Sequence, residues 1–143
     1  MSAEDVMAIQ QIAVAYADAL NRGSVLRAVS TYVADGRLET PAADPAIGHE
    51  AITAAVAEKI ANLELIFQTV HLGLVVVDGD RAEAQFPITE WARRAEDSRP
   101  FLFLGWYDDV LVRTDQGWRF SRRRLVPRIF ATADFVRAPL HPL

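Results

Sequence analysis

Few side chains in this sequence can carry acid–base chemistry, and two of them lie in its apolar middle. His71 stands in the run TVHLGLVVV, and an imidazole with an ordinary pKa of about 6.5 is a candidate general base. The alternative is a hydrogen-bonded core histidine. Glu90 alternates with Phe86 and Ile88, so it shares an apolar strand face with them. If that face lines a cavity, Glu90 is a second candidate acid or base; the alternative is a solvated strand end.

Missing residue types and motifs exclude several chemistries. The chain has no cysteine, which excludes disulfides, thiolate metal ligands and a cysteine nucleophile. The three histidines, His49, His71 and His141, are too scattered to form a metal-binding motif, so no metal is predicted. The sequence has no phosphate-binding glycine loop, dinucleotide fingerprint or nucleophile elbow, and no cofactor is predicted.

The only lysine, Lys59, bears on imine chemistry. It lies in a predicted amphipathic helix whose apolar face is formed by Ile52, Val56 and Ile60. Lys59 is therefore predicted to point to solvent and not into a desolvated site, which argues against an imine mechanism.

Charge and hydropathy set expectations for partners and compartment. The net charge of −4 argues against a nucleic-acid binder, because affinity for phosphate backbones comes from clustered positive charge. No apolar run approaches the ~20 residues of a membrane helix, and the acidic start MSAEDVM does not resemble a secretory leader. We expect a cytoplasmic protein that binds neither nucleic acid nor a membrane.

Hydrophobic periodicity predicts helices in the first half of the chain and mainly strands in the second. The predicted helices span about 2–20, a short segment after Ser24, and about 49–62. The predicted strands span 37–40, 65–77, 81–94, 101–113 and 118–128. Helices followed by a meander are typical of an α+β fold. We expect one domain over residues 1–143, with a core at about 4–130 and a tail at about 131–143.

The order of elements and four stretches of sequence resemble the SnoaL-like family of the nuclear transport factor 2-like superfamily. The stretches are IAVAYADALNRGSVLRAVSTYVADGRLETP, IGHEAI, VVVDGDRAEAQF and GWYDDVLVRTDQGWRFSRR. The resemblance implies a cone-shaped α+β barrel, with N-terminal helices packed on a strongly curved, mostly antiparallel sheet and a pocket at the wide end. It also implies homodimers through the outer sheet face, which the doubly apolar strands LGLVVV and FLFLGWY favour. It implies no single reaction, because one fold hosts many functions.

Two groups within that superfamily differ from this chain at their catalytic positions. Tyr16 falls where ketosteroid isomerases have the tyrosine that holds the oxyanion, but Thr40 falls where they have the proton-moving aspartate. Scytalone dehydratase-like members place an aspartate near Asn21 and a histidine near Phe67 or Gln68, and this chain has neither there. Neither mechanism is transferable as a whole.

The resemblance also implies roles within the strand GWYDD. Asp109 should pair with an arginine of the next strand, either Arg122 or Arg123, and Tyr107 should face the pocket. A phenol in a dry site can donate a hydrogen bond to a carbonyl or enolate oxygen, so Tyr107 and Tyr16 are predicted donors. The alternative is that both tyrosines satisfy backbone groups in the core.

Two functions remain open at this stage. The first is an isomerase, dehydratase or cyclase that moves a proton in a small hydrophobic, oxygenated, polyketide- or steroid-like molecule, with His71 or Glu90 as base and Tyr16 and Tyr107 as donors. The second is a non-catalytic ligand-binding or assembly module with the same fold. The predicted ligand contacts are Tyr32, Phe67, Gln68, Phe86, Phe103 and Trp106.

Overall fold

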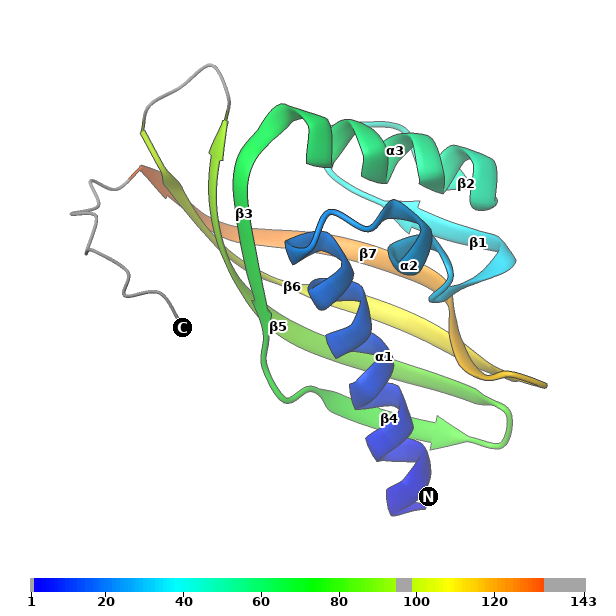
Figure 1. Cartoon of the computed structure of the whole chain (residues 1–143). Coiled ribbons are helices and arrows are strands. Elements are labelled where there is room, and N and C mark those ends of the chain that lie inside the picture. The colour runs from blue at the N-terminus through cyan, green and yellow to red at the C-terminus, as the bar shows by residue number, and fades with distance from the viewer. Residues whose placement is uncertain (1, 95–98, 133–143) are drawn as a thin grey trace, which may run out of the picture.

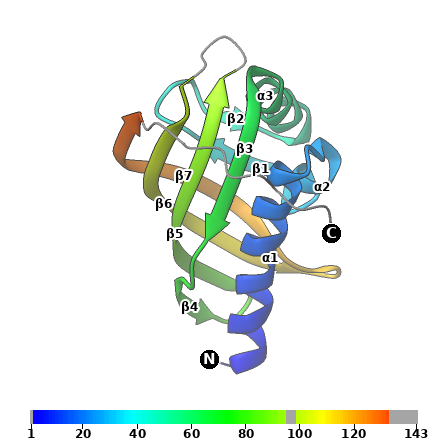
Figure 2. The ribbon, with the colours of Figure 1, turned by 60° about the vertical axis from the view of Figure 1, so that its left-hand side comes forward.

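The computed structural model describes residues 2–94 and 99–132. Its helices are α1 (Ala3–Asn21), α2 (Val25–Val29) and α3 (His49–Asn62). Its strands are β1 (Tyr32–Glu39), β2 (Ala46–Ile47), β3 (Leu63–Val70), β4 (Leu74–Asp78), β5 (Arg81–Arg94), β6 (Phe101–Thr114) and β7 (Gly117–Thr132). The helices lie on one side of a strongly bent sheet that does not close on itself (Figures 1 and 2). The predicted α+β cone is confirmed.

Helix α1 forms where a capped start precedes one apolar stripe. The Ser2 side chain accepts a hydrogen bond from the Asp5 backbone N–H, and the Asp5 carboxylate lies in the first turn, where negative charge is favourable. Ile9, Tyr16 and Leu20 are buried at spacings of seven and four residues, so one face of the helix packs against the sheet.

The sheet has the strand order β2-β1-β7-β6-β5-β3, and β4 pairs with β5 beyond the end of β3. Strands β1 and β7 are parallel, and the other neighbours are antiparallel. The β6–β7 pair changes register between Leu104 and Gly105 and again between Val110 and Leu111. Such bulges bend a strand and increase its twist, which gives the sheet a concave face toward the helices.

The predicted strand 65–77 is interrupted by a bulge. Strand β3 ends at Val70, opposite Ile88 of β5, and β4 begins at Leu74, opposite Gln85. Three residues of the connection therefore oppose two residues of β5. The extra residue reverses which side chains face the helices, so β3 and β4 do not continue one alternating pattern.

The core lies between the concave face and the helices. Phe86, Leu111 and Phe120 of the sheet are fully buried there with Ile9 of α1 and Ile52 of α3. Alternate residues of the same sheet point to the convex face, where several apolar side chains are exposed: Leu65, Phe67, Leu74, Val76 and Ile129.

Candidate functional site

A cavity of about 560 Å³ lies between α3, the segment that follows β1, and the concave face of β6 and β7. Its wall is mostly apolar and includes Leu38, Val56, Phe103, Leu125, Pro127 and Phe130. The polar residues among its lining are Tyr16, Thr40, Glu58, Lys59, Asn62 and Tyr107, of which Glu58 is exposed. An apolar wall with a few polar groups is typical of a small-molecule pocket.

Lys59 of α3 lines this cavity and forms an ion pair with Glu90 of β5. The Lys59 Nζ lies 2.9 Å from Glu90 Oε1, and the two side chains are 32% and 8% exposed. The prediction that Lys59 points to solvent is therefore wrong. Lys59 stands seven residues after Ile52 and three after Val56, both buried, so its spacing already continued the buried stripe of α3.

The buried amide of Gln68 connects Glu90 to Tyr107. Its Nε2 lies 3.1 Å from Glu90 Oε1 and 3.3 Å from the Tyr107 hydroxyl oxygen. An ionised carboxylate only accepts hydrogen bonds, so the amide nitrogen and not the amide oxygen must face Glu90. Because Gln68 donates to the Tyr107 oxygen, the Tyr107 proton is free for another acceptor, and Tyr107 lines the cavity.

Asn21, at the end of α1, holds Gln68 through its backbone. Asn21 Nδ2 donates to the Gln68 carbonyl at 2.9 Å, and the Gln68 N–H donates to Asn21 Oδ1 at 2.7 Å. Two positions at which the resemblance implied an aspartate and a histidine thus lie in contact, but both carry amides, which do not titrate. Their separation of 47 positions in the sequence hides this contact from local sequence patterns.

Tyr16 and Tyr107 meet at the inner wall of the cavity. Their ring centroids are 6.0 Å apart and their planes nearly perpendicular. Burial raises the pKa of Tyr107 to about 12, although the nearby Arg123 guanidinium opposes this increase. Burial also raises the pKa of Tyr16. Both hydroxyls are therefore protonated at neutral pH and can donate hydrogen bonds, but neither is a base.

The buried ion pair Asp109–Arg123 lies behind these phenol rings. Arg123 Nε and Nη2 each donate to one carboxylate oxygen of Asp109 at 2.9 Å. The guanidinium carbon lies 3.7 Å from the Tyr107 ring centroid and 4.7 Å from that of Tyr16. The predicted pairing of Asp109 with an arginine of the next strand is confirmed, and its partner is Arg123. The pair fixes a cation against both rings and so supports the cavity wall.

Three predicted ligand contacts lie on the concave side of the sheet at different depths. Phe103 lines the cavity directly. Tyr32 is buried with its ring edge-on to Tyr16, at a centroid separation of 6.0 Å. Phe86 is fully buried and pairs with Tyr107 across β5 and β6. Tyr32 and Phe86 therefore support the residues of the wall from behind.

Three other predicted site residues lie away from this cavity. His71 is exposed, and its Nε2 lies 2.9 Å from Thr89 Oγ1. Phe67 is 57% exposed on the convex face, and Trp106 borders a small hollow of that face. Side chains alternate along a strand, so Gln68 faces the helices and Phe67 does not.

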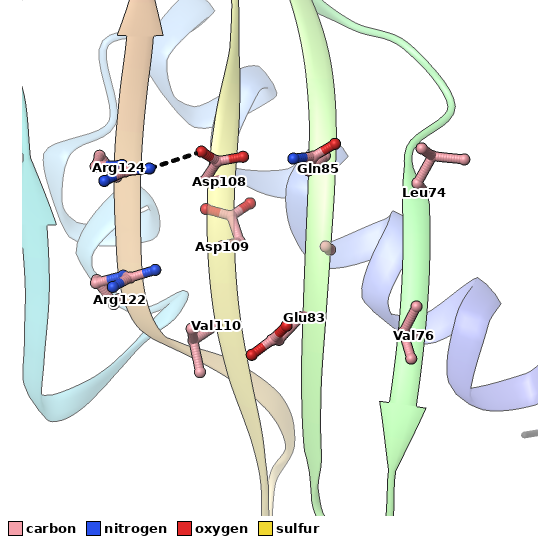
Figure 3. Close-up of a pocket in the computed structure, with 10 residues that line it drawn as sticks. Leu74, Val76, Glu83, Gln85, Asp108, Asp109, Val110, Arg122 and Arg124 are labelled. Carbon is pink, nitrogen blue, oxygen red and sulfur yellow. Dashed lines mark hydrogen bonds and ion pairs between the residues drawn. The ribbon is translucent and has the colours of Figure 1, made fainter.

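A second hollow, of about 390 Å³, lies on the convex face of β4 to β7 (Figure 3). Its lining includes Leu74, Val76, Glu83, Gln85, Asp108, Val110, Arg122 and Arg124. Arg124 Nη2 lies 3.0 Å from Asp108 Oδ2, and the Arg124 side chain is 50% exposed. The acidic and basic side chains of this hollow are in contact with water and offset one another, so they would change the pKa of a reacting group only weakly.

Neither a metal centre nor a membrane segment is evident in the part of the chain that the structure describes. Residues 2–94 and 99–132 contain no group of three or more His, Cys, Asp or Glu side chains that could hold a metal ion. Within the same ranges, no helix is long and apolar enough to cross a membrane.

Sequence comparison identifies relatives over most of the chain. Residues 1–124 match the SnoaL-like domain family. An uncharacterized protein of Mycobacterium tuberculosis is 29% identical over 121 residues, which cover 83% of this chain and 82% of that protein.

Solved structures share the fold at low sequence identity. A provisionally assigned scytalone dehydratase of Novosphingobium aromaticivorans has a TM-score of 0.81 and 19% identity, covering 92% of this chain and 89% of that one. The hexachlorocyclohexane dehydrochlorinase LinA-type3 of Novosphingobium barchaimii has a TM-score of 0.84 and 14% identity, covering 94% of both chains. At these identities the likeness shows the fold alone.

Proposed function

The chain belongs to the SnoaL-like domain family, and from this premise we propose that it catalyses a proton transfer in a hydrophobic, oxygenated, cyclic molecule bound in the cavity beneath α3. The proposed reaction is an isomerisation, dehydration or cyclisation without a metal or organic cofactor. The names of the two structural neighbours, a dehydratase and a dehydrochlorinase, favour an elimination or a related reaction.

The position of Glu90 is the observation that carries this proposal. Both hydrogen bonds that it accepts, from Lys59 and Gln68, fall on Oε1. Oε2 therefore has no hydrogen-bond donor among the described residues. A carboxylate held by one oxygen in poorly solvated surroundings can accept a proton with the other. Glu90 is not itself among the residues that line the cavity, but it contacts Lys59, which does, and Gln68 connects it to Tyr107. The other predicted base, His71, is exposed and contacts Thr89.

The proposed reaction begins when Glu90 Oε2 removes a proton from a carbon next to a carbonyl group. The electron pair of the broken C–H bond moves into the ligand, and negative charge collects on the ligand oxygen. Tyr107 donates its free proton in a hydrogen bond to that oxygen, and Tyr16 is the second proposed donor. Protonated Glu90 then returns the proton, to another carbon in an isomerisation or to a departing hydroxyl group in a dehydration.

Deuterium exchange tests this proposal without knowledge of the natural substrate. A panel of cyclic ketones and hydroxyketones is incubated with the protein in D₂O, and mass spectrometry measures deuterium bound to carbon. We expect exchange with the wild type and a rate lower by about a hundredfold or more with Glu90→Gln. Glu64→Gln is the matched control, because Glu64 is 56% exposed and paired with Arg93. Undiminished exchange in Glu90→Gln would refute the role of Glu90.

A non-catalytic ligand-binding module is the second candidate function. The amide pair Asn21–Gln68 favours it, because two positions that hold an acid and an imidazole in related dehydratases hold neither here. This function predicts that members of the same panel bind the wild type but exchange no deuterium.

We also propose that two copies of the chain pair through the convex face. Phe67, Leu74 and Val76 project from it with 57%, 75% and 67% exposure, and the hollow beside them holds Asp108 and Arg124 (Figure 3). A two-fold-related copy can cover the apolar side chains and match charges of opposite sign. Light scattering should give a dimer at high micromolar concentration and a monomer for Val76→Asp. A monomeric wild type would contradict the proposal.

A further inference from the structure

Lys59 is the only lysine of the chain and the one basic residue among the described residues that line the cavity. Its ammonium group has three N–H donors, and among residues 2–94 and 99–132 one of them is used, toward Glu90 Oε1. Arg123, a second cation near the site, is fully buried behind the phenol rings and donates twice to Asp109. Lys59 is therefore the cation whose pairing can change during a reaction in the cavity.

The proposed proton transfer removes negative charge from Glu90. Before the reaction, Lys59 balances the ionised carboxylate across 2.9 Å. When Glu90 accepts a proton its carboxyl group becomes neutral, and the ligand oxygen gains the charge that Glu90 has lost. An ammonium group whose partner has been neutralised in a largely apolar cavity is stabilised by the nearest new anion.

Resting on that proposed function, we infer that Lys59 is a catalytic residue that pairs with the ligand's anionic oxygen once Glu90 has been protonated. Tyr107 donates a hydrogen bond to this oxygen, and Lys59 supplies the positive charge. The same ammonium group thus balances two anions in succession, first the Glu90 carboxylate and then the ligand.

This exchange of partners also specifies the class of ligand. In the resting site Glu90 already neutralises Lys59, so a preformed carboxylate would enter next to an occupied cation and a second negative charge. A neutral molecule that becomes an oxyanion only in the site meets no such repulsion. The site therefore fits an enolisable cyclic ketone or a phenol-like ring in preference to a carboxylic acid.

Binding of para-nitrophenol provides the test, because its neutral and ionised forms differ in visible absorbance. The phenolate represents the oxyanion, and Glu90→Gln represents the protonated glutamate. We expect Glu90→Gln to bind the phenolate about tenfold or more tightly than the wild type, because glutamine carries no charge that competes for Lys59.

The double variant E90Q/K59M identifies the source of that gain. It should lose the whole gain and still fold, because it removes both members of the ion pair, whereas Lys59→Met alone leaves a buried carboxylate unpaired. E90Q/R22M is the matched control, because Arg22 is an exposed cation paired with Asp18 and its loss should leave the gain intact. Equal phenolate affinity in E90Q and E90Q/K59M would overturn the inference.

Failure of this inference is distinguishable from failure of the proposed function. If the higher phenolate affinity of Glu90→Gln depends on Lys59 but the wild type exchanges no deuterium, Lys59 is supported as an oxyanion-binding residue and the proton transfer is refuted. If deuterium exchange depends on Glu90 but the phenolate affinity of Glu90→Gln does not change when Lys59 is replaced, Glu90 is supported as the base and the role of Lys59 is refuted.

Discussion

Neighbouring aspartates of β6 form ion pairs with neighbouring arginines of β7 on opposite faces of the sheet. Asp109 and Arg123 face the helices, with side-chain exposures of 0% and 1%, and make two hydrogen bonds of 2.9 Å. Asp108 and Arg124 face the convex side, with exposures of 20% and 50%, and make one contact of 3.0 Å. The same pair of residue types thus supports the cavity wall on one face and belongs to an open surface on the other.

This difference follows from what each face offers a polar side chain. On the convex face water can solvate a charged group, so no particular partner is required. On the concave face a polar side chain needs a specific partner, and Glu90, Gln68 and Tyr107 hold one another there. A reaction that needs a fixed proton acceptor and a fixed donor therefore belongs to the concave face.

Removing one carboxylate from each pair gives the largest expected contrast. Asp109→Asn leaves the Arg123 charge buried without a counter-ion, so the free energy of unfolding should fall by about 3–5 kcal/mol. Urea denaturation measures this loss. A loss no greater than that of the matched Asp108→Asn variant would show that burial does not separate the two pairs.

The pH dependence of stability provides a second test of the concave face. A tyrosine in the unfolded chain ionises near pH 10, whereas burial raises the pKa of Tyr107 to about 12. Stability from the buried neutral phenol is fully present below pH 10 and is lost as pH rises toward 12, because the unfolded chain releases its proton first. The fall attributable to Tyr107 is roughly 2–3 kcal/mol. Urea denaturation between these pH values should show a smaller fall for Tyr107→Phe, and parallel curves would contradict this origin.

The Tyr107 hydroxyl should matter to turnover while a convex-face hydroxyl should not. Tyr107→Phe removes one donor to the ligand oxygen and should lower the deuterium-exchange rate about tenfold to a hundredfold. Thr69→Val removes an exposed hydroxyl from β3 and is the matched control. An unchanged rate in Tyr107→Phe, with its fold intact by circular dichroism, would exclude Tyr107 as a donor.

The exposed pair gives the smallest expected effect. At a protein concentration low enough to keep the chain monomeric, Asp108→Asn should change the free energy of unfolding by about 1 kcal/mol or less, since water solvates the remaining arginine. The change should shrink further in high salt, which screens exposed charges. Denaturation curves of the monomer at low and high salt measure both effects, and a large, salt-independent loss would contradict the solvated state of this pair.

Periodicity sufficed to predict the architecture and part of the site. The change of period near Leu65 separated the helices from the long strands, and the apolar stripe of α1 placed Tyr16 on the inner side. The positions of Tyr107 and Asp109 in the strand GWYDD were implied by the family resemblance, and the structure has both residues buried on the concave face. The limits of the helices and strands needed only the pattern of one element at a time.

The rest of the site depends on contacts between elements and on side-chain length. Lys59 was predicted to point to solvent because apolar residues form the other face of its helix. The long lysine side chain can instead lie along apolar surface while its ammonium group reaches a distant partner, here Glu90. The contact of Asn21 with Gln68 joins the end of α1 to β3. His71 stands where the bulge between β3 and β4 begins, and its exposure follows from pairing with β5 that no local pattern reveals.

A crystal structure of Glu90→Gln with para-nitrophenolate tests the concave site most directly. The ligand ring should lie against Phe103 in the cavity beneath α3, with its oxygen within hydrogen-bond distance of Lys59 Nζ and the Tyr107 hydroxyl. A ligand seated only in the convex hollow beside Arg122 would place anion binding on the opposite face and contradict the proposed site.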